Sequence, residues 1–207
     1  MDGVLNFLKP PGMTSHDVVA WLRRLTGEKR IGHTGTLDPA ATGVLVVCLG
    51  SATRLSEYLI DSDKAYRAEA TLGSTTSTQD SWGQFESEVN ASGVTREDLL
   101  RVMARFRGEI QQVPPMVAAV KVGGRRLYQL AREGLEVERE PRRVTISALE
   151  LIDFQPGPRA RATFDVVCSK GTYIRTLCAD IGRELGVGAH MSVSYTHLRA
   201  HETVLEL

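Results

Sequence analysis

The feature that most constrains the fold is a short apolar run that follows a segment rich in glycine and threonine. Residues 44–49 (VLVVCL) form the longest uninterrupted apolar stretch of the chain, which is a usual length for a buried strand. A helix that spans a bilayer needs roughly 20 apolar residues, and the N-terminus lacks the charged start of a signal peptide. We therefore expect a cytoplasmic protein without a membrane partner.

The segment before this run, residues 32–43, predicts a loop. It places three glycines, three threonines, a histidine and one carboxylate, that of Asp38, within twelve residues. Catalytic groups concentrate in loops that a rigid scaffold positions, and glycines allow backbone amides to approach a ligand closely. Two interpretations of Asp38 remain open: a catalytic carboxylate, or a residue that caps a turn with Pro39 at its second position.

The rest of the chain reads as short strands alternating with amphipathic helices. Because there is no repeating βαβ unit, the pattern favours the α+β class, and 207 residues suit one large domain or two small ones. Ser15 and Thr95 are predicted helix caps. The predicted strands are residues 4–8, 44–49, 65–72, 117–122, 144–154 and 162–167, and the predicted helices are residues 16–26, 52–59, 96–106, 127–132 and 173–185.

Charge and cysteine content exclude little by themselves. The chain has 25 basic and 25 acidic residues, but residues 101–143 hold ten Lys or Arg against five Asp or Glu. That block is either a surface that faces phosphates or a solvated helix face. The three cysteines, Cys48, Cys168 and Cys178, have no CxxC spacing, so neither a disulfide framework nor a zinc site is indicated.

A second candidate segment, residues 169–176, begins the last predicted helix. It places Tyr173 after Gly171 and Arg175 two positions later. An arginine is suited to holding an ionised aspartate, because its planar fork binds a carboxylate through two charge-assisted hydrogen bonds. The alternative for Tyr173 is an ordinary packing residue, and for Arg175 a surface charge.

Four segments, taken in order, resemble the TruB family of tRNA pseudouridine synthases: residues 9–15 (KPPGMTS), 32–43 (GHTGTLDPAATG), 64–66 (KAY) and 171–175 (GTYIR). The resemblance runs from about Val4 to Met191. It implies an α+β catalytic domain over residues 1–191, with a central, largely antiparallel mixed sheet flanked by helices. It also implies isomerisation of uridine to pseudouridine at position 55 in the T loop of tRNA, without a cofactor or a metal. We expect a monomer.

The resemblance also assigns roles to side chains. Asp38 matches the catalytic aspartate, which acts as the nucleophile, and Arg175 matches the residue that pairs with it. Tyr173 matches a tyrosine beneath the target base, Tyr66 a ring that stacks on the uracil, and His33 a side chain that enters the loop when bases are extruded. Attack on the base, attack at the sugar carbon and a glycal route all remain open.

Further RNA contacts are implied outside this centre. Asp80, in the turn of residues 78–83, is expected to contact RNA or to shape the turn, and Lys9 is expected to bind substrate. Residues 114–143 resemble a thumb-like insert, although Val117 and Ala118 stand where the family commonly has an aromatic residue and a serine. Four of its basic residues are candidate phosphate contacts, which fix register without reading bases: Lys121, Arg125, Arg126 and Arg132.

Residues 192–207 do not resemble the family, which usually continues into a small PUA-type RNA-binding domain. We interpret this tail as a truncated or wrongly joined reading frame. His197 and His201 are four residues apart, but two ligands without a third do not indicate a metal site.

The sequence also allows comparison with three other classes of function. The chain could be a non-catalytic tRNA-binding or tRNA-folding module, or an inactive fragment of a synthase. A phosphotransferase or hydrolase using Asp38 would need a second acidic residue beside it for Mg²⁺ and an apolar strand directly before it, and the sequence has neither. Guide-RNA-dependent synthases are disfavoured by the insert at residues 75–83 and by the lack of a long accessory region.

Overall fold

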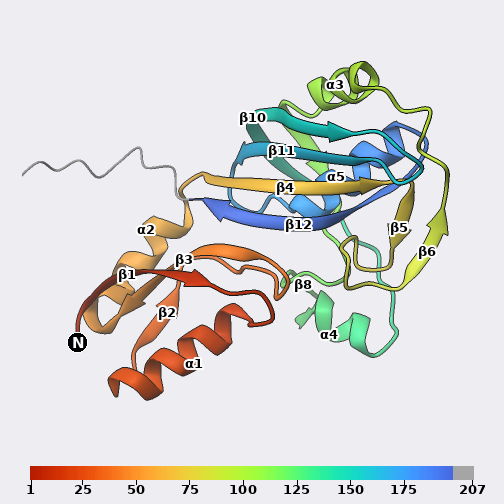
Figure 1. The fold of residues 1–207 in the computed structure, drawn as a ribbon. Coiled ribbons are helices and arrows are strands. Elements are labelled where there is room, and N and C mark those ends of the chain that lie inside the picture. The colour runs from red at the N-terminus through yellow and green to blue at the C-terminus, as the bar shows by residue number, and fades with distance from the viewer. Residues whose placement is uncertain (198–207) are drawn as a thin grey trace, which may run out of the picture. The chain divides into compact units, whose positions relative to one another are not determined.

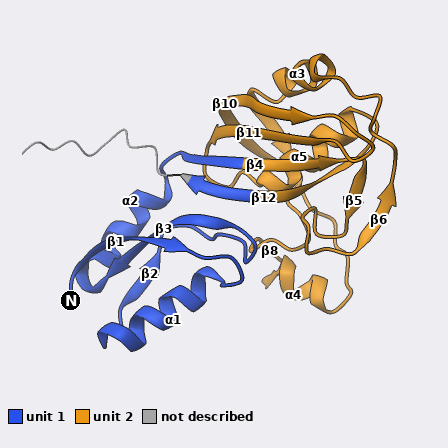
Figure 2. Ribbon diagram, viewed as in Figure 1, with its two compact units in different colours: residues 1–67, 194–207 blue, residues 68–193 orange. Residues whose placement is uncertain are grey.

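The computed structural model describes residues 1–197 of the chain, with side chains up to residue 196. The described part of the chain (Figure 1) divides into two compact units (Figure 2): unit 1 contains residues 1–67 and 194–197, and unit 2 contains residues 68–193. Two strands, β4 (Lys64–Leu72) and β12 (Ala189–His197), begin in one unit and end in the other. The domain end expected at residue 191 falls inside β12. The side chain of His197 and the whole of His201 lie outside the described residues.

Unit 1 is organised around β3, which contains the apolar run of residues 44–49. β3 pairs antiparallel with β1 and with β2, and its first residues pair in parallel with the end of β12. The predicted helix over residues 52–59 is divided into a 3₁₀ helix and a short α-helix. Besides parts of β4 and β12, the elements are β1 (Gly3–Lys9), α1 (Ser15–Thr26), β2 (Ile31–His33), β3 (Thr42–Leu49), η1 (Gly50–Leu55) and α2 (Ser56–Ile60).

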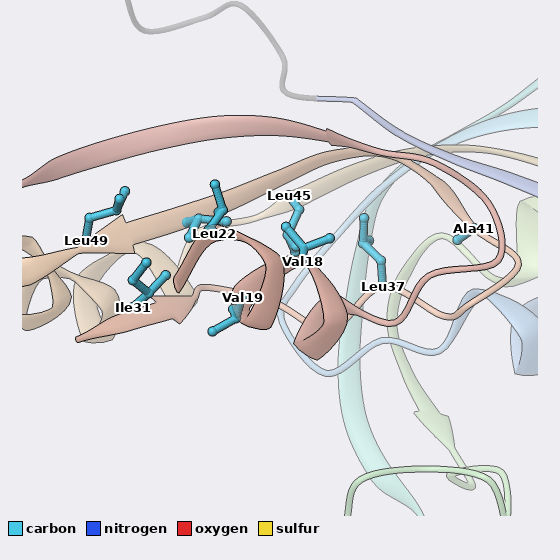
Figure 3. Close-up of a cluster of buried hydrophobic side chains, with 9 residues drawn as sticks. Val18, Val19, Leu22, Ile31, Leu37, Ala41, Leu45 and Leu49 are labelled. Atoms are coloured by element: carbon cyan, nitrogen blue, oxygen red, sulfur yellow. The ribbon is translucent and has the colours of Figure 1, made fainter. Parts of the chain in front are cut away.

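Helix α1 covers one side of these strands and supplies much of the core of unit 1. Apolar residues three and four positions apart place one face of the helix inward. The prediction that Ser15 caps this helix was wrong by one residue, because the N-cap is Thr14. The Thr14 hydroxyl accepts a hydrogen bond from the amide of Asp17 at 3.0 Å, and the Asp17 carboxylate accepts one from the amide of Thr14 at 2.8 Å. The helix ends at Gly27, with φ +70°, as predicted. The buried cluster (Figure 3) comprises Val18, Val19, Leu22, Ile31, Leu37, Ala41, Leu45, Val47 and Leu49.

Unit 2 contains a sheet with the strand order β12-β4-β11-β10-β7, and β10 pairs antiparallel with both of its neighbours. Together with the parallel contact of β12 and β3, these pairings confirm the predicted α+β class with a mixed, largely antiparallel sheet and flanking helices (Figure 1). The remaining elements are β5 (Ser74–Thr76), β6 (Phe85–Glu88), α3 (Arg96–Arg105), β7 (Gly108–Gln112), β8 (Lys121–Val122), β9 (Arg125–Arg126), α4 (Leu127–Arg132), β10 (Arg142–Gln155), β11 (Arg161–Cys168) and α5 (Ile174–Glu184).

The strand predicted over residues 117–122 is wrong for most of its length. Only its last two residues form a strand, β8, which pairs with β9. The carbonyls of Ala118 and Val120 instead accept hydrogen bonds from the amides of Tyr128 (3.1 Å) and Leu127 (2.8 Å) at the start of α4. The first amides of a helix lack hydrogen-bond partners within the helix. The carbonyls of this segment therefore provide partners for the first amides of α4 instead of pairing in a sheet.

Candidate active site

The loop that contains Asp38 is anchored by a buried cation. Lys9, the last residue of β1, is fully buried. Its Nζ donates to the carbonyls of Pro10 (3.1 Å), Met13 (2.8 Å) and Pro39 (3.2 Å). Lys9 therefore joins the turn after β1 to the residue that follows Asp38. A contact of Lys9 with substrate stays a prediction.

Two further contacts hold the same loop on both sides of Asp38. The amide of Gly12 donates to Pro39 O at 2.8 Å. The hydroxyl of Ser15 accepts from the amide of Leu37 at 2.9 Å and donates to the carbonyl of Leu37 at 3.3 Å. The two neighbours of Asp38 are thus both bound by residues between the end of β1 and the start of α1, which fixes the backbone that carries this half-buried residue.

The electrostatics of Lys9 and Asp38 are linked. Burial lowers the pKa of Lys9, and the negative charge of Asp38 partly opposes that shift. By the same Coulomb interaction, the ammonium group favours the ionised form of the Asp38 carboxylate. An ionised carboxylate held in a fixed loop is suited to nucleophilic attack or to withdrawal of a proton.

His33 and Tyr66 lie in the same unit. His33 ends β2 and is half-buried, and its Nδ1 has no hydrogen-bond partner among the residues the structure describes. Burial lowers the pKa of this imidazole, with a smaller contribution in the same direction from His16 and an opposing one from a backbone hydrogen bond to Gly35. The half-buried ring of Tyr66, near the start of β4, packs against the core cluster of unit 1.

In unit 2, Arg175 and Asp80 form a buried ion pair. Arg175 Nη1 lies 3.3 Å from Asp80 Oδ2, and the side chains are 6% and 10% exposed. The other oxygen, Oδ1, accepts from the Thr78 hydroxyl at 2.6 Å and from the amide of Trp82 at 3.0 Å. Arg175 also donates to the carbonyls of Thr78 (3.3 Å) and Val117 (3.4 Å). Asp80 therefore shapes its turn, which is one of the two roles expected for it, and it also provides a charge partner for Arg175. A contact of Asp80 with RNA stays a prediction.

Tyr173 stands at the start of α5, in the N-cap position with an extended backbone. Its ring packs against a small cluster formed by Ala118, Leu127 and Leu130. Its backbone is bound on both sides by the side chain of Gln112, a residue that the sequence analysis did not select. The local sequence around Gln112 gives no signal of such a contact, because its partner is 61 residues away.

Gln79 is a second residue that the sequence analysis did not select. It adopts φ +62° and is the one non-glycine residue with positive φ in the described part of the chain. Its Oε1 accepts from the hydroxyl of Thr176 at 2.8 Å. Unfavourable backbone conformations persist where surrounding contacts enforce them, and they cluster at functional sites. The turn that carries Asp80 is thus attached to α5 at two successive helix residues, Arg175 and Thr176.

The four candidate phosphate-binding residues of the thumb-like insert, Lys121, Arg125, Arg126 and Arg132, are exposed. The guanidinium groups of Arg126 and Arg132 lie 5.9 Å and 5.6 Å from the centre of the Tyr128 ring, within the range of cation–π attraction. Arg125 forms an exposed ion pair with Glu133. Lys121 lies on β8, which pairs with the strand of Arg125 and Arg126. Four positive groups therefore surround one short hairpin and the helix that follows it.

The predicted site residues are distributed over both units. Lys9, His33, Asp38 and Tyr66 belong to unit 1, whereas Asp80, Tyr173, Arg175 and the basic residues of the insert belong to unit 2. The pairing of Asp38 with Arg175 stays a prediction. Among the described residues, no group of three His, Cys, Asp or Glu is placed to hold a metal ion. No helix within residues 1–197 has both the length and the apolar character needed to cross a membrane.

Comparison with known proteins decides the family. The model of the TruB family pseudouridylate synthase (N terminal domain) matches residues 23–174. The chain belongs to the TruB family. Proteins named tRNA pseudouridine synthase B are 66% identical to this TruB chain in Symbiobacterium thermophilum, 55% in Pelotomaculum thermopropionicum and 59% in Moorella thermoacetica, over 92–93% of its length. The chain spans only 64%, 61% and 63% of these relatives, respectively.

Solved structures support the same fold. A chain in "Crystal Structure of a Cbf5-Nop10-Gar1 Complex" matches with a TM-score of 0.72 and 36% identity, over 95% of this TruB chain and 48% of that chain. A chain in "Structure of H/ACA RNP bound to a substrate RNA containing 2'-deoxyuridine" matches with a TM-score of 0.68 and 33% identity. This match covers 95% of the TruB chain and 47% of the other chain. The resemblance inferred from the four sequence segments is thereby confirmed at the level of family and fold.

Proposed function

We propose that this chain isomerises uridine to pseudouridine in tRNA. Its membership of the TruB family and the names of its curated relatives support the reaction. The single observation that carries the proposal is the loop of residues 32–43, in which the backbone on either side of Asp38 is fixed by Lys9, Gly12 and Ser15. The proposed substrate is the uridine at position 55 in the T loop.

The chemistry requires little besides a positioned carboxylate. The N1–C1′ glycosidic bond breaks, the uracil rotates, and C5 forms a new bond to C1′. C5 loses its proton and N1 gains one, so the product is an isomer of the substrate. Asp38 is the proposed nucleophile. Attack on the base, attack at the sugar carbon and elimination to a glycal all use the ionised form, which the charge of Lys9 favours. No cofactor or metal enters this scheme.

Arg175 is the proposed charge partner of Asp38. The buried guanidinium of Arg175 is oriented by the carboxylate of Asp80 and by the backbone carbonyls of Thr78 and Val117. We propose that Arg175 interacts with both aspartates during the reaction, Asp80 as an orienting group and Asp38 as the reacting one.

A uridine inside a folded loop must be extruded before it can react, at a cost of a few kcal/mol for unstacking. We propose that Tyr66 stacks on the extruded uracil and that Tyr173 lies beneath it. His33 is proposed to enter the vacated position in the T loop. A neutral imidazole suits stacking, and the burial that lowers the pKa of His33 keeps the ring neutral near pH 7.

The exposed cations of the insert are proposed to bind the phosphates of the T stem and loop. Phosphate contacts by Lys and Arg supply affinity and register. Arg126 and Arg132, grouped around Tyr128, are the strongest candidates, since Arg125 is already paired with Glu133. A monomer and a cytoplasmic location are further parts of this proposal.

The test is pseudouridine formation in an unmodified tRNA transcript, with no added metal or nucleotide. We expect product at the T-loop uridine, no product with Asp38→Asn, and unchanged product with Asp63→Asn, which alters an exposed carboxylate. Turnover of Asp38→Asn at the wild-type level would overturn the assignment of Asp38. Binding of tRNA by a folded chain without any product would favour the alternative of a tRNA-binding module or an inactive fragment.

A further inference from the structure

Gln112, the last residue of β7, makes an unusual pair of hydrogen bonds. Its side chain is buried, with 1% of the residue exposed. Its Nε2 donates to the carbonyl of Tyr173 at 3.1 Å, and its Oε1 accepts from the amide of Tyr173 at 2.8 Å. One primary amide thus binds both backbone groups of one residue, which fixes the position and the orientation of that residue's backbone.

The location of this contact matters for α5. The first amides of a helix have no partner within the helix, and no side chain of the N-cap residue Tyr173 serves them here. The amide of Tyr173 points out of the helix and is bound by Gln112. Tyr173 is also the residue where the extended backbone (φ −99°, ψ 108°) changes to the helical backbone that carries Arg175. A shift of Tyr173 would therefore move both proposed active-site side chains.

The segment that follows Gln112 makes two more contacts with the same turn. The carbonyl of Val117 accepts from Arg175 Nη2 at 3.4 Å, and Ala118 belongs to the cluster against which the Tyr173 ring packs. The same segment leads into the hairpin that presents the exposed cations of the insert. The first turn of α5 is therefore joined to the base of the RNA-binding insert at three points, of which Gln112 is the most fully buried.

We propose that Gln112 is a positioning residue for the isomerisation: it holds the backbone of Tyr173, and through it Arg175, in the arrangement that the reaction needs. This inference rests on the proposed function. Gln112 does not touch the substrate, so its loss is expected to slow the reaction without weakening RNA binding. Misplacement of a catalytic group by about 1 Å can lower a rate by about 100-fold.

Two variants of Gln112 separate its two hydrogen bonds. Gln112→Met keeps the approximate volume and removes both bonds. Gln112→Glu keeps the acceptor for the Tyr173 amide but places a carboxylate oxygen against the Tyr173 carbonyl, which is repulsive. Gln111→Met is the matched control, because Gln111 precedes Gln112 on β7 and is exposed.

The first experiment measures single-turnover pseudouridine formation at saturating tRNA, together with the tRNA dissociation constant. For Gln112→Met we expect a rate about 10- to 100-fold lower with a dissociation constant within about twofold of wild type. For Gln112→Glu we expect a rate loss at least as large, because its carboxylate oxygen repels the Tyr173 carbonyl. In the double variant of Gln112→Met and Tyr173→Phe, the fold-loss in rate should be smaller than the product of the two single fold-losses, because both substitutions act on Tyr173. A wild-type rate in Gln112→Met, or losses that multiply fully, would overturn the proposal.

A second experiment does not depend on activity. Hydrogen exchange at the Tyr173 amide should be slow in the wild-type chain and in Gln111→Met, and faster in Gln112→Met, while exchange in β10 and β11 is unchanged. If Gln112→Met does not fold, the rate and exchange of Gln112→Glu decide the question. A wild-type chain that forms no pseudouridine would contradict the proposed function, whereas equal exchange at Tyr173 in wild type and Gln112→Met would contradict this inference alone.

Discussion

The ammonium group of Lys9 lies 3.2 Å from the carbonyl oxygen of Pro39, the residue directly after Asp38. With two further carbonyl acceptors at Pro10 and Met13, this fully buried cation replaces the water that a loop carbonyl would otherwise bind. A charged group is costly to bury unless it is hydrogen-bonded. Lys9 therefore serves as an internal anchor for the loop that contains Asp38.

Replacing Lys9 with Met should lower both stability and activity. Three carbonyls would lose their common donor, and a buried polar group without a partner costs about 1–3 kcal/mol. We expect a lower midpoint of urea unfolding, and a single-turnover rate reduced more than the tRNA affinity. Lys29→Met removes an exposed lysine and serves as the control. Normal stability and rate in Lys9→Met would show that the anchor is not required.

Substitution of Asp80 should impair the reaction although the residue is not the proposed nucleophile. Asp80→Asn removes the charge of one member of a buried ion pair with Arg175, and breaking a buried ion pair in this way typically costs about 3–5 kcal/mol. We expect reduced thermal stability and a rate well below that of the control Asp153→Asn, which changes an exposed carboxylate. The measurements are thermal unfolding and single-turnover kinetics. If Asp80→Asn had the thermal stability and the rate of the wild type, other groups would have to compensate the charge of Arg175.

Local patterns in the sequence predict the elements well but not the contacts that build the site. The α4 bounds are those predicted, residues 127–132, and the capping pattern at Thr95 is confirmed, because helix periodicity and capping act within a few residues. The contacts of Arg175 with Asp80 and of Gln112 with Tyr173 join residues 95 and 61 positions apart. Only the tertiary fold brings such residues together, so no local pattern signals them.

The burial of His33 predicts a pH dependence of stability. Its folded-state pKa lies below the ordinary value of 6.5, so the unfolded chain binds a proton more readily than the folded chain. The contribution of His33 is therefore fully present above pH 6.5 and is lost as the pH falls towards the lowered folded-state pKa. We expect the free energy of unfolding to decrease between pH 7.5 and pH 5.5, and to decrease less in His33→Gln. Parallel pH profiles for the two chains would contradict this assignment.

The grouping of Arg126 and Arg132 around Tyr128 predicts how tRNA binding responds to salt. If each arginine neutralises one phosphate, Arg126→Ala or Arg132→Ala should weaken binding and lower the slope of log K against log salt concentration by about 1. Arg101→Ala is the control, because Arg101 is exposed on α3 and paired with Asp98. The single-turnover rate at saturating tRNA should stay near wild type, since neither side chain is proposed to act on the uridine. An unchanged slope in both variants would place the phosphate contacts elsewhere on the chain.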